Sequence, residues 1–266
     1  MRGRVLIVAG SDSGGGAGIQ ADIKTVTALG GYAATAITAL TAQDTHDVHE
    51  VVGVAPAFIR RQMEVVLADI GADAVKLGML HDGPVIDAVC DVLESAGAGI
   101  PVVADPVMVA KGGARLLSED AVATLRDRLL PLARIVTPNV SEAEVLAGMP
   151  IARPSDGPEA AARILALGME AVLLKGGHMA GDTVTDLLVA AEGSRAFEHP
   201  RIETTSTHGT GCTLASAIAT GIAQGWGLED AVARAIEYVQ EAIRRAPGYG
   251  SGHGPLDHGH TVIPQD

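Results

Sequence analysis

The chain has 266 residues, and 32 Asp and Glu against 19 Lys and Arg give a net charge of −13, which argues against a protein that coats nucleic acid. Hydrophobic residues make up 47% of the chain although it has only one Trp, three Tyr and two Phe. The core is therefore expected to consist mainly of Ala, Val, Leu and Ile. Two cysteines, Cys90 and Cys212, exclude a disulfide scaffold and favour a reducing, cytoplasmic setting.

The sequence starts with a short apolar run, residues 5–9, which is too short for the apolar part of a signal peptide. No apolar stretch approaches the roughly 18 residues that a membrane helix needs. We therefore expect no membrane segment and no targeting segment. The length suits one α/β domain, and we expect a single domain over residues 1–266.

Short apolar runs alternate with amphipathic stretches along most of the chain, a rhythm typical of strands joined by helical crossovers. The runs are continuously apolar, as expected of parallel strands buried on both faces. The predicted strands are 5–9, 33–40, 74–77, 102–104, 135–137 and 171–175, and the predicted helices are 17–29, 56–68, 84–95, 118–129, 141–147 and 158–167. The pattern predicts an α/β fold with a largely parallel sheet covered on both faces.

The pattern changes after Lys175. Residues 183–190 and 195–203 are typical of a hairpin with its turn at residues 192–194, which predicts an antiparallel edge on the sheet. Two long helices are predicted next, over 211–224 and 228–245. A tail rich in Gly, His and Pro follows over residues 247–266, and we expect it to pack near the functional site.

Lysine is rare in this chain, and three of the lysines stand in or beside glycine-rich loops. In open parallel sheets ligands bind beyond the carboxyl ends of strands, where glycine lets the backbone approach a ligand closely. Lys76, Lys111 and Lys175 are therefore either ligand contacts or ordinary solvated charges, and the position of Lys175 at the end of a buried strand favours a contact. The glycines that follow predicted strands are Gly10, Gly14 to Gly16, Gly112, Gly113, Gly176, Gly177, Gly209 and Gly211.

Two glycine loops invite a nucleotide-binding interpretation. The first, AGSDSGGGAGIQAD (9–22), lacks the spacing of a dinucleotide-binding fingerprint, and the absence of any Gly-Lys dipeptide excludes a Walker P-loop. The second, TTSTHGTGCT (204–213), directly precedes an apolar helix. The backbone N–H groups of Gly209, Thr210, Gly211 and Cys212 would point outward from the positive end of that helix and form an anion site.

A thiol at the start of a helix is expected to have a lowered pKa, and Cys212 stands at that position. The alternative is that these residues only cap the helix and that Cys212 is a small buried side chain. Cys90 lies on an apolar helix face and is expected in the core. The histidines lack the companion ligands of a zinc site.

Several strings taken together carry a resemblance to a known family. They are AGSDSGGGAGIQADIK (9–24), TALTAQDT (38–45), VKLGML (75–80), DPVMVAKGG (105–113), TPNVSEAE (137–144), LLKGGH (173–178), TTSTHGTGCT (204–213) and GSGHGPLDH (250–258). The chain resembles the hydroxymethylpyrimidine/phosphomethylpyrimidine kinases of thiamine biosynthesis, a branch of the ribokinase-like superfamily. The resemblance implies a three-layer α/β/α fold, a homodimer, and a site at the carboxyl edge of the sheet for ATP and a small pyrimidine alcohol.

The resemblance also implies catalytic roles. The amides of Gly209, Thr210, Gly211 and Cys212 would stabilise charge on the transferred phosphoryl group, because phosphoryl transfer depends mostly on positioning and electrostatics. Cys212 stands where many sugar kinases of the superfamily have an aspartate base, so it would accept the proton of the substrate hydroxyl. Lys175 would neutralise phosphate charge on ATP.

For the ligands, the resemblance implies that Asp105 and Glu142, with Asn139, hold Mg²⁺ and its nucleotide directly or through waters. Asp22 and Gln43 would recognise the aminopyrimidine by hydrogen bonds. Without the resemblance, Asp22 would be interpreted as an exposed acid that stabilises the start of its helix. The remaining implied substrate contacts are Gly10, Met79 and Val107.

Three other functions stay open at this stage. Pyridoxine and pyridoxal kinases share the fold and the anion site, although Gln43 in its TAQ context favours a pyrimidine. Asp44 stands where the pyrimidine kinases more often have asparagine, which weakens that preference slightly. A cysteine hydrolase could pair Cys212 with His208 or His178, but it would leave Lys175 without a role. A ligand-sensing protein without catalysis is the third alternative.

Overall fold

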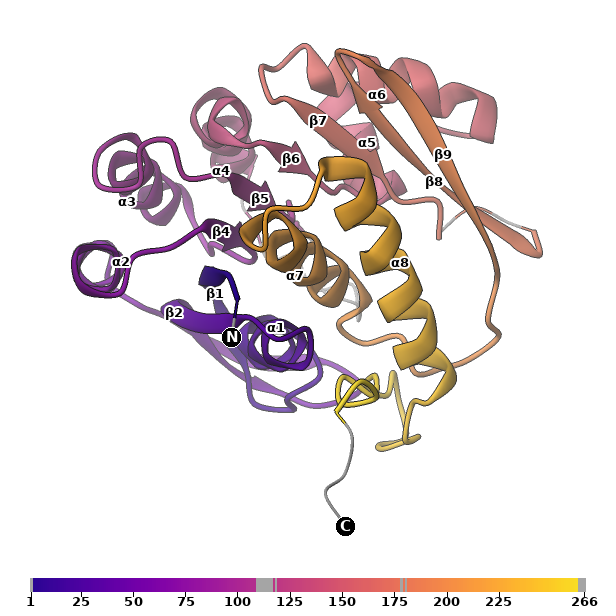
Figure 1. Cartoon of the computed structure of the whole chain (residues 1–266), viewed down its shortest axis with the longest axis horizontal. Coiled ribbons are helices and arrows are strands. Elements are labelled where there is room, and N and C mark those ends of the chain that lie inside the picture. The colour runs from indigo at the N-terminus through magenta and orange to yellow at the C-terminus, as the bar shows by residue number, and fades with distance from the viewer. Residues whose placement is uncertain (1, 109–116, 118, 178, 180, 263–266) are drawn as a thin grey trace.

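One sheet forms the middle layer of the molecule (Figure 1). The structure is a computed structural model that describes residues 2–108, 117, 119–177, 179 and 181–262. Within these residues the sheet has nine strands in the order β3-β2-β1-β4-β5-β6-β7-β8-β9. The strands are β1 (Arg4–Asp12), β2 (Tyr32–Gln43), β3 (Val48–Gly53), β4 (Ala74–Leu77), β5 (Val102–Ala104), β6 (Ile135–Val136), β7 (Ala171–Leu174), β8 (Thr183–Ala190) and β9 (Gly193–Pro200).

The pairing of the strands places the carboxyl ends of the central ones at one edge. Strands β1, β2, β4, β5, β6 and β7 pair in parallel. The hairpin of β8 and β9 pairs antiparallel with β7, which confirms the predicted antiparallel edge. β3 pairs antiparallel with β2 at the opposite edge, and the sequence pattern does not predict it. Most of β3 is exposed, so it lacks the apolar run that marks the inner strands.

Helices cover both faces of the sheet, which confirms the predicted three layers (Figure 1). α4 (Glu119–Thr124) continues into a single π-helical turn, Leu125–Leu129. Ser118, the first residue of the helix predicted there, lies outside the described residues. One face packs against α2 (Pro56–Asp69), α3 (Gly83–Glu94), α4 (Glu119–Thr124), α5 (Val140–Ala147) and α6 (Gly157–Leu165), and the other against α1 (Gly18–Ala28), α7 (Thr210–Ala223) and α8 (Leu228–Arg244).

Strand β1 shows how the sequence builds two cores. Successive side chains of a strand point to opposite faces, so Leu6 and Val8 join the core under α2 and α3, while Ile7 joins the core under α7 and α8. Both cores consist mainly of aliphatic side chains, as the composition predicts. Cys90 is fully buried in the first core, which confirms its expected structural role.

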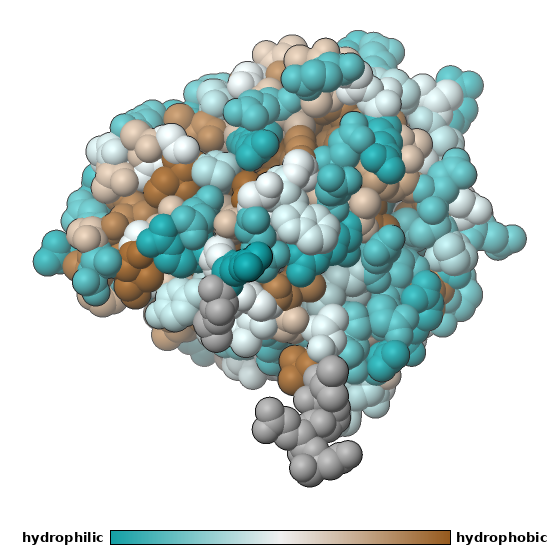
Figure 2. Space-filling model, in the orientation of Figure 1, coloured by the Kyte–Doolittle hydropathy of each residue, from teal (hydrophilic) through white to brown (hydrophobic). Residues whose placement is uncertain are grey.

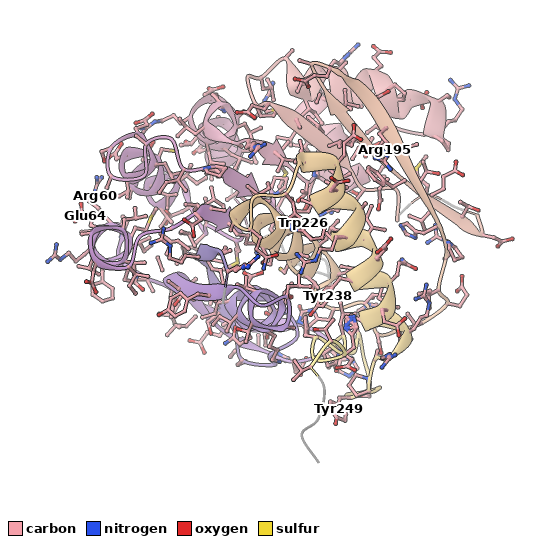
Figure 3. All side chains as sticks on the ribbon, in the orientation of Figure 1. Arg60, Glu64, Arg195, Trp226, Tyr238 and Tyr249 are labelled. Atoms are coloured by element: carbon pink, nitrogen blue, oxygen red, sulfur yellow. The ribbon has the colours of Figure 1, made fainter. Side chains whose placement is uncertain are left out.

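The C-terminal tail packs against the end of the sheet and against α8. The His253 N–H donates to the Thr45 carbonyl at 2.7 Å, and the Nε2 atom of His258 lies 3.0 Å from the Thr213 hydroxyl oxygen. The Tyr238 hydroxyl on α8 donates to the His258 carbonyl; Figure 3 labels Tyr238 and also Tyr249, which belongs to the tail. These contacts fix the tail beside the first turn of α7.

The surface carries most of the acidic surplus. Hydrophilic side chains cover much of the face seen in Figure 2, with hydrophobic ones between them. No helix in the described part of the chain is long and apolar enough to cross a membrane. Within the described residues the buried acidic side chains are Asp12, Asp22, Asp105, Glu142 and Asp186.

Candidate active site

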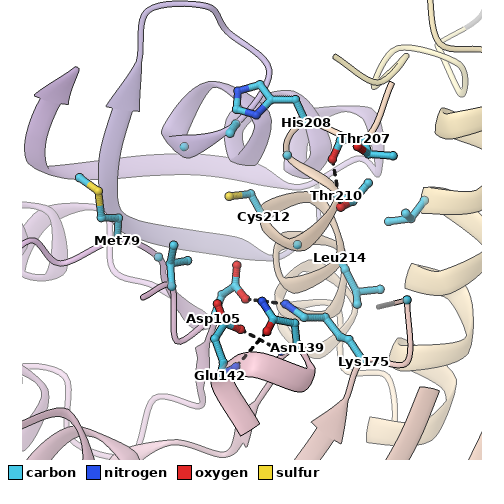
Figure 4. Close-up of a pocket in the computed structure, with 18 of the residues that line it drawn as sticks. Met79, Asp105, Asn139, Glu142, Lys175, Thr207, His208, Thr210, Cys212 and Leu214 are labelled. Atoms are coloured by element: carbon cyan, nitrogen blue, oxygen red, sulfur yellow. Dashed lines mark hydrogen bonds and ion pairs between the residues drawn. The ribbon is translucent and has the colours of Figure 1, made fainter. Parts of the chain in front are cut away.

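A cavity of about 640 Å³ opens at the carboxyl edge of the sheet (Figure 4). Residues that follow β1, β4, β5, β6 and β7 line it, together with the start of α7 and one side of α8. The parallel strands therefore deliver their loops to one place, as expected for an open α/β sheet. Lys111, Gly112, Gly113 and His178, which the sequence singled out, lie outside the described residues.

The loop before α7 is shaped by a close approach to the first glycine loop. Gly209 has a left-handed backbone (φ +81°), and a Cβ there would lie 1.9 Å from the Gly16 carbonyl oxygen, so only glycine fits. Among the described residues, the backbone N–H groups of Gly211 and Cys212 have no hydrogen-bond partner. The Thr210 hydroxyl turns back to the Thr207 carbonyl at 3.2 Å. The start of α7 thus presents the free N–H donors of Gly211 and Cys212 to the cavity, whereas the Thr210 N–H, also predicted to be free, donates to the Thr207 carbonyl at 3.5 Å.

A cluster of two carboxylates and one lysine lies on one side of this loop (Figure 4). The Lys175 ammonium lies 3.0 Å from Asp105 Oδ1. Asn139 and Glu142 form a capping box at the start of α5, with the Asn139 N–H donating to Glu142 Oε2 at 2.8 Å and the Glu142 N–H donating to Asn139 Oδ1 at 2.9 Å. The fold brings Asp105, Asn139, Glu142 and Lys175 together at the cavity, as expected.

The cluster has more negative than positive charge. Burial, together with the charge of Asp105, raises the pKa of Glu142 to about 7 against the opposing effect of Lys175. Such a site suits a cation with oxygen ligands. The described residues hold no group of three or more His, Cys, Asp or Glu that could bind a metal by themselves. A metal here would complete its ligands with phosphate oxygens and water, which is how Mg²⁺ usually binds.

Cys212 lies in the first turn of α7, half-buried, with its sulfur directed into the cavity (Figure 4). The prediction that the helix start lowers its pKa is wrong. Burial raises the pKa of the thiol to about 11, although the Lys76 ammonium and the Gly18 backbone amide act in the opposite direction. The loss of water around a thiolate outweighs the favourable charges that face it.

Asp22 does not take the predicted position of a substrate contact. It is fully buried and does not line the cavity, because both its carboxylate oxygens bond the Lys76 ammonium at 2.8 Å and one accepts from the Ser216 hydroxyl at 2.7 Å. The alternative of an exposed helix acid is also wrong. Lys76 is fully buried too, so it is not an ordinary solvated charge.

Gln43, Gly10, Met79 and Val107 all line the cavity, as the resemblance implies for substrate contacts. A Cβ at Gly10 would lie 2.7 Å from the Met79 methyl group, so the glycine leaves room for that side chain. Gln43 ends β2, and its amide oxygen lies 3.2 Å from the Thr41 hydroxyl oxygen. The fixed amide gives this part of the cavity a directed polar group.

The sequence did not indicate the buried contact between Asp12 and His208. His208 Nε2 lies 2.8 Å from Asp12 Oδ2 and 3.4 Å from Gln43 Nε2. Burial raises the pKa of Asp12, but hydrogen bonds from His208 and from the Ala17 and Gly14 amides outweigh this and lower it. The pair joins the first glycine loop to the anion loop. A hydrolytic pairing of His208 with Cys212 is not supported, since no hydrogen bond joins them among the described residues.

Comparisons with known proteins agree with this geometry. The family model described as phosphomethylpyrimidine kinase matches residues 12–257. The chain belongs to the phosphomethylpyrimidine kinase family. It is therefore a phosphotransferase with a ribokinase-like fold, and the predicted family, fold and enzyme class are confirmed.

Curated relatives of this kinase are similar over nearly the whole chain. The hydroxymethylpyrimidine/phosphomethylpyrimidine kinase of Bacillus subtilis is 45% identical over 96% of this chain and 94% of its own length, and that of Escherichia coli is 43% identical over 96% and 97%. The thiamine biosynthesis bifunctional protein ThiED of Geobacter sulfurreducens is 54% identical over 97% of this chain. The chain spans only 52% of that bifunctional protein.

Solved structures share the fold of this kinase closely. The phosphomethylpyrimidine kinase of Clostridium difficile has a TM-score of 0.81 at 40% identity, covering 90% of this chain and 99% of its own. The pyridoxal kinase of Bacillus subtilis, solved as an ADP complex, has a TM-score of 0.89 at 34% identity, covering 97% and 98%. The fold is thus common to pyrimidine and pyridoxal kinases, so the substrate depends on side chains in the cavity.

Proposed function

We propose that this kinase transfers the γ-phosphoryl group of ATP to 4-amino-5-hydroxymethyl-2-methylpyrimidine, and then to the monophosphate formed, in thiamine biosynthesis. The observation that carries the proposal is the position of Cys212 in one cavity with the free amides of α7, the Lys175–Asp105 pair and the fixed amide of Gln43. The groups that would bind phosphate and the amide that would recognise the substrate therefore line the same cavity as Cys212, the proposed base. The names of the curated relatives support the same substrate.

The chemistry requires one proton transfer and one phosphoryl transfer. The thiolate form of Cys212, a small fraction at neutral pH because burial raises the thiol pKa to about 11, accepts the proton as the O–H bond of the substrate breaks. The freed electron pair of the oxygen forms a bond to the γ-phosphorus, and the bond from that phosphorus to the bridging oxygen of ADP breaks. The Gly211 and Cys212 amides stabilise the charge on the transferred group, because they are already oriented toward the cavity.

Lys175 binds phosphate in this proposal. Its ammonium is near the start of α7, since a Cβ added to Gly211 would lie 3.2 Å from Lys175 Nζ. Burial lowers the pKa of Lys175, but Asp105 and Glu142 outweigh this and raise it, so the side chain stays charged. A cation at this place can contact the same phosphoryl group as the α7 amides.

Mg²⁺ fits the two buried carboxylates of Asp105 and Glu142, each of which is less than a tenth exposed. When bound with the nucleotide, it neutralises phosphate charge. Asn139 positions Glu142 through the capping box, in which the Asn139 N–H holds one carboxylate oxygen of Glu142. We expect chelation of divalent cations to abolish turnover.

The nucleotide base has an apolar wall available to it. Leu214 of α7 lines the cavity together with Ile236, Val239 and Ile243 on one face of α8, and Val184 of β8 belongs to the same cavity. Aliphatic side chains bury a planar base without competing for its hydrogen bonds. The few aromatic residues of the chain are therefore not needed for stacking.

Pyridoxal is the alternative substrate, because solved pyridoxal kinases match this chain with TM-scores of 0.89 to 0.90 at 33% to 34% identity. Pyrimidine is preferred, since the curated pyrimidine kinases are 41% to 46% identical. A side-by-side ATP-dependent assay decides between them. We expect a higher kcat/KM for hydroxymethylpyrimidine, and faster phosphorylation of pyridoxal would overturn the choice.

We further propose a cytoplasmic homodimer. The compartment is supported by two cysteines that are both free, which suits a reducing setting. The dimer rests on the family resemblance, and sedimentation equilibrium of the purified chain tests it directly.

A further inference from the structure

A buried lysine that has no role in the scheme above lies next to the cavity. Lys76 is the third residue of β4, its side chain is fully buried, and it belongs to the cavity wall that also holds Cys212. Burying an ammonium costs free energy that a single carboxylate partner rarely returns, so a buried lysine is weak evidence for stability. Its position in the same cavity wall as Cys212 gives it a use.

Two contacts hold the ammonium of Lys76, and a third holds its carboxylate partner. Both oxygens of Asp22 lie 2.8 Å from Nζ, and Ser216 on α7 donates to Asp22 at 2.7 Å. Ser216 is four residues after Cys212, so the two side chains lie on the same face of α7. Gly78 leaves the space, because a Cβ there would lie 3.0 Å from the Lys76 Nζ atom.

The charges that face Cys212 come from every element packed around it. Lys76 on β4 and the Gly18 amide at the start of α1 favour negative charge on the sulfur, while Asp22 on α1 and Asp105 after β5 oppose it. Lys175 after β7 adds a second cation. Of the charged side chains, Lys76 has the largest effect on the thiol, larger than that of Asp22.

We propose that Lys76 is a positioning residue for phosphoryl transfer: held by Asp22, its ammonium supports negative charge on the sulfur of Cys212 and so lets Cys212 accept the substrate proton. Asp22 then has two effects, because it fixes the lysine and also offsets part of its charge. The inference rests on the proposed base role of Cys212. It assigns to Asp22 an indirect role in place of the substrate contact that the sequence suggested.

The test measures the reactivity of the Cys212 thiol without ATP or substrate. All variants carry Cys90→Ala, so that one thiol remains, and the rate of alkylation by iodoacetamide is measured from pH 7 to 10. Lys76→Met is expected to slow alkylation by roughly tenfold, since it removes the cation that supports the thiolate. Asp22→Asn is expected to accelerate it, since it removes an opposing charge.

Opposite changes in the alkylation rate of the two variants distinguish this role from a merely structural one. If the pair only holds the fold together, both substitutions loosen the same site and change alkylation in the same direction, which overturns the proposal. An unchanged rate in Lys76→Met also overturns it. Ser216→Ala is the matched control, because it removes a hydrogen bond to the pair but no charge, and its rate is expected to stay within about twofold of the parent.

A second variant keeps the test decisive if Lys76→Met does not fold. The double variant Lys76→Met/Asp22→Asn buries no unpaired charge, and it is expected to alkylate more slowly than the parent, because the lysine has the larger effect on the thiol. A rate equal to or above that of the parent contradicts the proposal. Alkylation needs no pyrimidine substrate, so a failed kinase assay and a failed charge effect are distinguishable.

Discussion

Two lysine–aspartate pairs stand at the carboxyl edge of the sheet, and they differ in how firmly each lysine is held. Lys76 bonds both oxygens of Asp22 at 2.8 Å and is fully buried. Lys175 lies 3.0 Å from one oxygen of Asp105, and 15% of its side chain is exposed. The first lysine is enclosed with its partner, whereas the second is partly exposed and can also contact a phosphate. One pair acts on a neighbouring thiol, and the other acts on the ligand.

Both lysines stay charged for the same physical reason. Burial lowers the pKa of each, but nearby carboxylates outweigh burial and raise it. What separates them is exposure and not charge, because part of the Lys175 side chain is exposed and none of the Lys76 side chain is. The comparison therefore predicts that substitutions at the two sites differ in kind: loss at Lys175 removes a ligand contact, and loss at Lys76 changes the reactivity of Cys212.

The largest effect is expected at Lys175. Lys175→Met should lower kcat/KM by about 10³, because the cation meets charge that develops on the phosphoryl group. Steady-state kinetics with ATP and hydroxymethylpyrimidine measure it. Arg163→Met is the matched control, since Arg163 is an exposed cation on α6 paired with Glu159, and its kinetics should not change. A loss of less than about fivefold at Lys175 would remove the distinction between the two pairs.

The next largest effect is expected at Cys212. Cys212→Ala and Cys212→Ser should each lower kcat by about 10² or more, with the fold preserved, because both remove the proton acceptor. Circular dichroism reports the fold and a coupled ADP assay reports kcat. Cys90→Ala is the control, because Cys90 lies in the core. Near-normal turnover in both Cys212 variants would exclude it as the base.

The buried contact between Asp12 and His208 extends the comparison, because it joins two loops and has no part in the proposed chemistry. Asp12→Asn should lower the free energy of unfolding by about 1 to 3 kcal/mol at pH 7, since the carboxylate accepts from His208 and from the Gly14, Gly16 and Ala17 amides.

The effect of Asp12→Asn should depend on pH with a defined sign. The pKa of Asp12 is lowered in the folded chain, so its stabilisation is complete above the unfolded pKa of about 4 and is lost as the pH falls toward the folded pKa. Urea unfolding at pH 7 and pH 3 measures the difference between the wild type and the variant. A gap that widens at pH 3 would show that Asp12 is not a stabilising carboxylate.

The smallest effect at pH 7 is expected at His258 of the tail. Burial lowers its pKa to about 4, so the folded chain holds this histidine neutral and loses stability as the pH falls from about 6.5 toward 4. His258→Gln keeps a donor for the Thr213 oxygen and should cost about 1 kcal/mol at pH 7. Thermal unfolding across this pH range should show a weaker pH dependence in the variant. An equal dependence in both proteins would assign it to other groups.

The fold could be predicted wherever burial leaves a local pattern. The inner strands read as apolar runs because both of their faces are covered, and β3 was not predicted because an exposed edge strand has no such run. The anion loop was also predictable, since Gly209 and Gly211 directly precede an apolar helix. These features depend on residues that are neighbours in the sequence.

The parts of the site that could not be predicted depend on residues that are far apart in the sequence. Asp22 bonds Lys76, which is 54 positions away, and Asp12 bonds His208, which is 196 positions away. No local pattern joins such residues, so Asp22 was assigned to the substrate and the pair of Asp12 and His208 was not predicted. The predicted lowering of the Cys212 pKa is wrong for the same reason, because burial by the rest of the chain raises this pKa more than the helix start lowers it.

One measurement tests the proposed activity most directly. The purified chain is incubated with ATP, Mg²⁺ and hydroxymethylpyrimidine, and the products are identified by mass spectrometry while ADP is counted. The proposed function predicts the monophosphate first and the diphosphate later, with one ADP released for each phosphoryl group transferred. Absence of any phosphorylated pyrimidine, from a preparation that phosphorylates pyridoxal under the same conditions, would contradict it.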